Sequence, residues 1–192
     1  MLILASASPR RKELLDQIGL TFEVETADID ETPRLGEEPI AYTMRLAEHK
    51  AAAVFARQRQ RGVNPERLVV LGADTTVVCE GQILGKPEDD ADAARMLRLL
   101  AGKRHTVVTG VAVLTGMASP VVEAEVTTVE MIALNESQIA GYIATGEPQG
   151  KAGGYAIQGR AARFIPRIEG CYFNVVGLPL ARISAILGRL QR

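Results

Sequence analysis

Leu2-Ile-Leu-Ala-Ser-Ala-Ser-Pro-Arg-Arg-Lys-Glu-Leu14 is the stretch that decides the fold. Its apolar start, Leu2–Ala5, predicts a buried strand. Ser8 is a favourable N-cap residue, and Pro9 suits the first position of a helix, which we expect over residues 9–18. A strand that runs through a short serine-rich turn into a helix is a building block of α/β proteins.

Arg10 and Arg11 fall in the first turn of that predicted helix. Cations there oppose the helix dipole, so they cost a little stability. The arrangement suits a polyanion such as a phosphate chain, held by backbone N–H groups, serine hydroxyls such as that of Ser8, and guanidinium groups. The alternative is a solvated helix start whose arginines bind nothing.

The composition excludes several classes of function. The chain has 192 residues, of which 47% are hydrophobic and 23% charged, as in one globular unit over residues 1–192. The net charge of −1 and the absence of Trp argue against a nucleic-acid surface. No stretch is apolar enough for a membrane span or a secretory signal, and Cys79 and Cys171 lack metal spacing. We therefore expect a cytoplasmic protein.

Strands and helices alternate along the first half, and a long hairpin follows. The fold class expected is α/β, with a mixed sheet and flanking helices. Helices are predicted at 39–61, 89–100, 136–144 and 179–190. Strands are predicted at 22–26, 68–71, 77–79, 82–84, 106–114, 121–132, 155–157 and 163–168.

Two groups of acids are candidate catalytic or metal-binding residues. Asp74 follows the apolar run Leu68–Leu71, where a carboxylate is costly without a partner or a role. It could bind a metal or act as a general base, beside the hydroxyl of Thr75, or it could be an ordinary turn residue. Glu31 closes the acidic stretch 28–31, which could share Mg²⁺ with Asp74 or simply be solvated.

Two lysines and one glutamine are candidate ligands for a nucleotide. Lys86 lies in a Gly-Lys-Pro loop and could bind phosphate, whereas Lys50 on the long helix is more typical of a solvated face. Gln158 lies in a loop between glycines and could read a base edge, or it could be a turn residue. His105 is expected at a strand edge.

In order along the chain, five motifs resemble the Maf family of nucleoside triphosphate pyrophosphatases. They are Ala5-Ser-Ala-Ser-Pro-Arg-Arg-Lys-Glu-Leu-Leu, Gly72-Ala-Asp-Thr, Gly85-Lys-Pro, Lys151-Ala-Gly-Gly-Tyr-Ala-Ile-Gln-Gly and Asn174-Val-Val-Gly-Leu-Pro-Leu. The resemblance implies a twisted, elongated, two-lobed domain with a central cleft, related to the inosine triphosphatases. It also implies a divalent cation, Mg²⁺ or Mn²⁺, and allows a homodimer.

In such a protein, water attacks the α-phosphorus and releases the monophosphate and pyrophosphate. The resemblance makes Asp74 the proton acceptor and associates Arg10, Thr75 and Gln158 with base choice. The family's other conserved charges match Arg11, Glu31, Lys50 and Lys86.

The motif pattern resembles the branch that acts on dTTP and UTP. The chain departs from that branch at Gly150, where the branch usually has Asp, so the base preference is open. Two alternatives remain at this point. One is a nucleotide-binding regulator of septum formation and cell division, and the other is a 7-methyl-GTP pyrophosphatase.

Overall fold

The computed structural model describes residues 1–190. They form two compact units. The chain crosses between the units four times: within three of its strands, and again between residues 176 and 177. Unit 1 comprises residues 1–74, 109–125 and 177–192, although the last two residues lie outside the described range. Unit 2 comprises residues 75–108 and 126–176.

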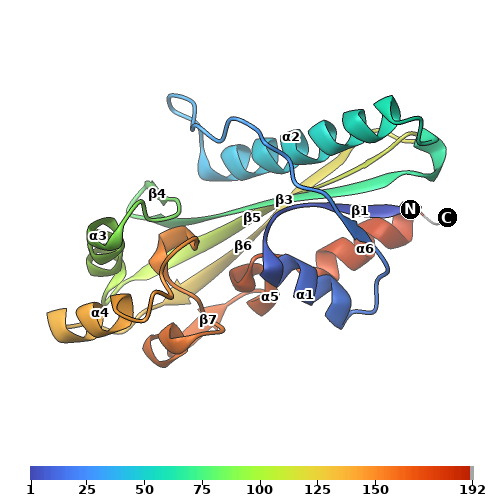
Figure 1. Ribbon diagram of the computed structural model, residues 1–192. Coiled ribbons are helices and arrows are strands. Elements are labelled where there is room, and N and C mark those ends of the chain that lie inside the picture. The colour runs from blue at the N-terminus through green and yellow to red at the C-terminus, as the bar shows by residue number, and fades with distance from the viewer. Residues whose placement is uncertain (191–192) are drawn as a thin grey trace. The chain divides into compact units, whose positions relative to one another are not determined.

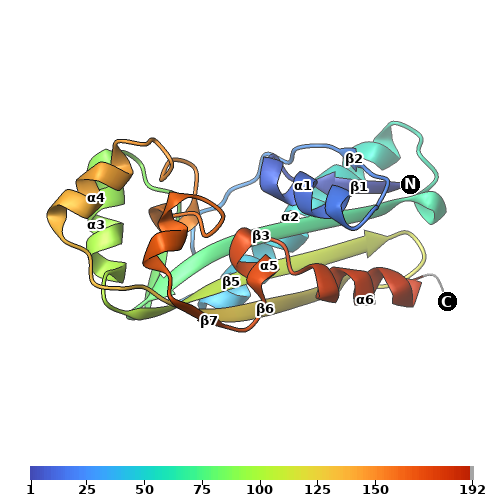
Figure 2. The ribbon, with the colours of Figure 1, turned by 90° about the horizontal axis from the view of Figure 1, so that it is seen from below.

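Unit 1 begins with the predicted strand–turn–helix. β1 (Leu2–Ala5) pairs in parallel with β3 (Val69–Cys79), with Leu2 opposite Val69 and Ala5 opposite Gly72. α1 (Pro9–Gln17) starts after Ser8 with Pro9 in its first turn, and Gly19 follows its end with φ of 72°. α2 (Pro39–Gln60) covers one face of the sheet, and α1 and α6 (Leu180–Leu190) cover the other (Figure 1, Figure 2).

α2 lies directly on the backbone of the sheet because two strand glycines leave room for it. A Cβ at Gly72 of β3 would lie 2.1 Å from Ala47 O. A Cβ at Gly110, in β5 (Arg104–Thr115), would lie 2.3 Å from Thr43 O. Small residues on the helix and glycine on the strands therefore set this close approach.

Unit 2 has its own apolar core, which contains Leu84, Leu97, Val129, Ile139 and Phe164. Its helices are α3 (Asp90–Leu100), capped by Asp89, and α4 (Glu136–Ile143), which has an Asn135–Gln138 capping box. Short elements complete it: β4 (Gln82–Leu84), η2 (Ala152–Gly154), η3 (Arg160–Phe164), β7 (Arg167–Glu169) and α5 (Tyr172–Val176).

The strands form one mixed sheet in the order β2-β1-β3-β5-β6-β7, with β4 paired to β3. β2 (Glu23–Val24) runs parallel to β1, whereas β4 and β7 run antiparallel to β3 and β6 (Val121–Glu130). The predicted α/β class with a mixed sheet and flanking helices is confirmed.

Three parts of the strand prediction need correction. The predicted strands 68–71 and 77–79 are one strand, β3, and Asp74 lies in its middle rather than in a turn. Tyr155–Ile157 forms no strand, because Gly153 and Gly154 both have φ near 70°, which turns the chain. Of the predicted strand 163–168, only residues 167 and 168 are in a strand, β7, which ends at Glu169, since Pro166 has no N–H to donate.

His105 lies next to the first residue of β5, near the end of a strand as predicted, and the structure shows in addition that it is buried. It lies in β5, between β3 and β6, and is 3% exposed. Its Nε2 lies 2.7 Å from Tyr155 Oη, and burial lowers the pKa of His105 to about 4. The imidazole is therefore neutral at neutral pH. The four helices predicted at 39–61, 89–100, 136–144 and 179–190 are present, each with one end shifted by one residue.

From residue 1 to residue 190, no helix is both long and apolar enough to cross a bilayer. Cys79 and Cys171 are free thiols.

Candidate active site

Lys50 joins two carboxylates in unit 1. Its Nζ lies 2.6 Å from Asp74 Oδ1 and 2.6 Å from Glu31 Oε1. The Lys50 and Asp74 side chains are 11% and 12% exposed, so the pair is largely withdrawn from water. The prediction that Lys50 belongs to a solvated face is wrong.

The close contact between α2 and β3 explains why Lys50 reaches Asp74. Ala51, the neighbour of Lys50, packs against Gly72, and Asp74 lies two residues farther along the same strand. Side chains alternate along a strand, so Asp74 emerges on the same face as Gly72, toward α2. Because α2 packs directly on Gly72, the Lys50 ammonium lies beside the Asp74 carboxylate.

The loop that carries Glu31 is tied to α2 by two side chains. Tyr42 Oη donates to Glu31 O at 2.9 Å. Arg45 makes a bidentate pair with Glu37, at 2.6 Å for each contact, and also donates to Thr32 O. Hydrogen bonds from Arg45 lower the pKa of Glu37 to about 2. Burial, with Asp74 and Glu31 nearby, raises the pKa of Tyr42 to about 12.

Arg11 is fixed by three oxygen acceptors. Its Nε donates to Gly177 O at 2.9 Å, and its Nη1 donates to Ala73 O at 2.8 Å and Ser6 Oγ at 3.2 Å. Burial lowers the pKa of Arg11, against the opposite influence of Asp74, and Arg10 adds to the lowering. The predicted arginines are therefore brought to the same region of unit 1 as Asp74.

Ser8 occupies the predicted N-cap position, but its side chain makes no capping hydrogen bond within the described chain. Its backbone N–H donates instead to Ser6 Oγ at 3.2 Å. Ser6, Tyr42 and Gly177 were not predicted as site residues. Tyr42 and Gly177 contribute through the loop and backbone contacts above. Gly177 lies in the fifth family motif, which could have marked it, whereas no motif in the sequence marks Tyr42.

Three predicted residues lie in unit 2. Thr75 follows Asp74 in β3 and is partly buried, whereas Lys86 and Gln158 are exposed on loops. The two loops are joined to each other, because Gly153 N donates to Gly85 O at 3.0 Å. The structure therefore links the Gly-Lys-Pro loop to the loop that carries Gln158.

The Glu31–Lys50–Asp74 cluster has a donor set that fits a divalent cation. Two carboxylates from different elements face one point, and a hard cation favours such oxygens together with water and phosphate oxygens. The cluster already holds a cationic group, the Lys50 ammonium, at that point. No group of three or more His, Cys, Asp or Glu side chains suited to a metal occurs among residues 1–190.

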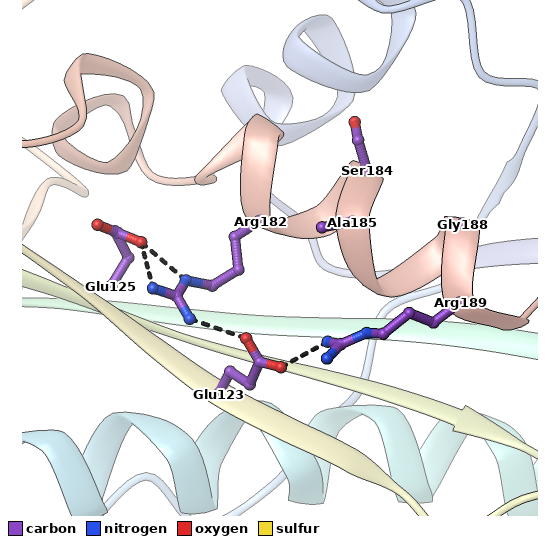
Figure 3. Close-up of a pocket in the computed structure, with 7 residues that line it drawn as sticks. All are labelled: Glu123, Glu125, Arg182, Ser184, Ala185, Gly188 and Arg189. Carbon is purple, nitrogen blue, oxygen red and sulfur yellow. Dashed lines mark hydrogen bonds and ion pairs between the residues drawn. The ribbon is translucent and has the colours of Figure 1, made fainter.

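A charged pocket in unit 1 lies between β6 and α6 (Figure 3). Arg182 lies between Glu123 and Glu125, at 2.8 Å and 2.7 Å, and Arg189 contacts Glu123 at 2.6 Å. All four charged side chains have partners inside the pocket, so we interpret it as a set of ion pairs that joins α6 to β6 rather than as a ligand site.

Residues 1–190 match the family described as "Maf: Maf-like protein". The chain belongs to the Maf family. Curated relatives extend over nearly the whole chain. One from Pelotomaculum thermopropionicum is named dTTP/UTP pyrophosphatase and is 52% identical over 187 residues. The alignment covers 97% of this chain and 94% of the relative. One from Koribacter versatilis, with the same name, is 50% identical, covering 98% and 93%.

Among solved structures, this Maf protein is similar to a HAM1 protein from Coxiella burnetii. The TM-score is 0.53 at 17% identity, and 98% of each chain is covered. At this identity the likeness concerns the fold alone, and it agrees with the α/β fold class expected from the inosine triphosphatase relationship.

Proposed function

We propose that this Maf protein is a nucleoside triphosphate pyrophosphatase that acts on dTTP and UTP. The observation that carries the proposal is the pairing of one lysine with Asp74 and Glu31 in unit 1. A protein that only binds nucleotides has no need of two converging carboxylates. The names of relatives that are 50% and 52% identical support the choice of substrate.

In this proposal, Asp74 orients a water molecule and accepts its proton as the oxygen attacks the α-phosphorus. The new bond joins the water oxygen to that phosphorus. The bond to the bridging oxygen of the β-phosphate breaks, and pyrophosphate leaves. Lys50 neutralises Asp74 between turnovers and supplies positive charge near the reacting phosphate.

The remaining cations neutralise the triphosphate. Arg10 and Arg11 act from the start of α1, with Ser8 beside them, and Lys86 acts from its loop. Because Arg11 is already held by Ser6, Ala73 and Gly177, it needs little reordering when a phosphate binds.

Glu31 and Asp74 would hold a divalent cation, Mg²⁺ or Mn²⁺, which when bound supplies charge neutralisation and lowers the pKa of its water ligands. Gln158 and Thr75 hydrogen-bond the pyrimidine edge in this proposal. A site built for polar pairing rejects a wrong base because its own groups are left unpaired. A cytoplasmic location and a homodimer stay predictions.

A panel of triphosphates with Mg²⁺ or Mn²⁺, assayed for pyrophosphate and orthophosphate, tests the proposal. We expect one pyrophosphate for each dTTP or UTP consumed and only slow turnover of 7-methyl-GTP. Release of orthophosphate as the first product would overturn the reaction type. Tight nucleotide binding without turnover would instead favour the regulator.

A further inference from the structure

Glu147 of unit 2 receives three hydrogen bonds that the proposed chemistry does not use. Tyr142 Oη donates to Oε1 at 2.7 Å, Arg160 N donates to Oε2 at 2.9 Å, and Ala161 N donates to Oε1 at 3.4 Å. The Tyr142 hydroxyl also accepts from Ala156 N at 3.2 Å. Glu147 and Tyr142 thus hold three backbone N–H groups.

These contacts fall on both sides of Gln158. Ala156 lies two residues before it and Arg160 two residues after it. Gly159 lies against the carboxylate, since a Cβ there would be 2.3 Å from Glu147 Oε1. The backbone that carries Gln158 is therefore held before Gln158 by the buried Tyr142 hydroxyl and after it by the Glu147 carboxylate.

The carboxylate suits this role because it is ionised. Burial by itself would raise the pKa of Glu147, but the hydrogen bonds from Arg160, Tyr142 and Ala161 outweigh that effect and lower it. An ionised carboxylate only accepts hydrogen bonds, so it matches three donors. Tyr142 is fully buried, and its ring packs edge-on against Phe164 at 6.0 Å.

We propose that Glu147 and Tyr142 are positioning residues that fix Gln158 and thereby set the discrimination between bases. The inference rests on the role proposed for Gln158. Its side chain is exposed, so its orientation depends on the backbone beneath it. A hydrogen-bonding group rejects the wrong base only if it cannot move to accommodate that base.

The test compares kcat/KM for UTP with that for CTP, because the two bases differ in their hydrogen-bonding edge. Glu147→Ala removes the acceptor, Glu147→Gln restores part of it, and Tyr142→Phe removes only the hydroxyl. Glu136→Gln is the matched control, since Glu136 lies on α4, the helix of Tyr142, and its carboxylate accepts from Arg98 on the exposed surface. Thermal unfolding of each variant is measured alongside.

We expect the UTP/CTP ratio to fall about tenfold in Glu147→Ala and Tyr142→Phe, to recover in part in Glu147→Gln, and to stay unchanged in Glu136→Gln. If Glu147→Ala does not fold, Tyr142→Phe still decides, because it keeps the packed ring. A purely structural role would lower turnover of both nucleotides equally, and an unchanged ratio would overturn the inference.

The failures of the two proposals are distinguishable. If Gln158→Ala alters the ratio while the Glu147 and Tyr142 variants do not, the positioning role is wrong and the base contact stands. If the unaltered protein releases no pyrophosphate from either nucleotide, the proposed function itself is wrong.

Discussion

Two clusters in unit 1 share one charge pattern, a cation between two carboxylates, yet they differ in burial and in balance. In the Glu31–Lys50–Asp74 cluster, a single ammonium serves two acids, one from a loop and one from a strand. In the pocket of Figure 3, Arg182 and Arg189 face Glu123 and Glu125, so two guanidinium groups meet two acids.

The difference is what sets the proposed reactive site apart from a network of structural ion pairs. Arg182 is 33% exposed, and its planar guanidinium divides fixed contacts between two acids of one strand. Lys50 is a compact point charge at 11% exposure, and its two acids outnumber it. In the proposed function, the largely buried Asp74 carboxylate takes up a proton or a metal ion, whereas Glu31 is 45% exposed and the carboxylates of the second cluster are each paired with a guanidinium group.

The largest expected effect separates the two clusters by activity. Asp74→Asn should lower pyrophosphate release about 1,000-fold, since it removes the proposed general base. Glu125→Gln, the matched change in the other cluster, should leave turnover unchanged. Steady-state kinetics with UTP measures both, and circular dichroism checks the fold. Near-normal turnover of Asp74→Asn would exclude the catalytic role.

The second prediction removes the close approach that creates the first cluster. Gly72→Ala places a Cβ 2.1 Å from Ala47 O, so α2 must move away from β3. We expect a loss of about 3 kcal/mol in the free energy of unfolding, from overpacking. Gly188→Ala on α6, where a Cβ meets nothing within 4 Å, is the control and should cost nothing. Urea unfolding compares them, and equal stabilities would contradict the account.

The third prediction compares the two central cations by stability. Lys50→Met leaves the buried Asp74 carboxylate without its ammonium and should cost about 3 kcal/mol. Arg182→Met breaks surface pairs and should cost less than about 1 kcal/mol. Both variants keep an apolar stem. If chemical unfolding gave equal losses, burial would not be what distinguishes the clusters.

The smallest effect concerns acid. Hydrogen bonds from Arg189 and then Arg182 lower the pKa of Glu123 below its ordinary 4.5, although burial opposes them. Its folded form therefore contributes stability above pH 4.5, and that contribution is lost as the pH falls through the lowered pKa. The stability difference between the unaltered protein and Arg189→Gln should be present at pH 7 and shrink in acid. A stability difference that grew as the pH fell would contradict this prediction.

Local sequence signals determined much of the fold. Ser8-Pro9 marked the start of α1, because N-terminal preferences act within one turn of the chain. In the structure, Asp89 and Asn135 cap α3 and α4 in the same local way. The five ordered motifs were sufficient for the Maf resemblance, and the family match over residues 1–190 confirms it. Asp74, Glu31 and Arg11 were all predicted from the residues or from that resemblance.

Tertiary structure decided the points that depend on distant partners. Gly72-Ala-Asp looks like a turn in isolation, but β3 pairs with β1 up to Gly72 and with β4 from Val77 on, and it is one continuous strand between them with β5 as its other neighbour. Lys50 looks like a solvated residue in the sequence, because its partner Asp74 is 24 positions away and is brought close only when α2 packs on Gly72. Caps and turns are fixed by neighbours in sequence, whereas a buried charge is fixed by whatever the fold places beside it. That is why the sequence determined the elements and the family, and only the packed molecule determined which charges meet.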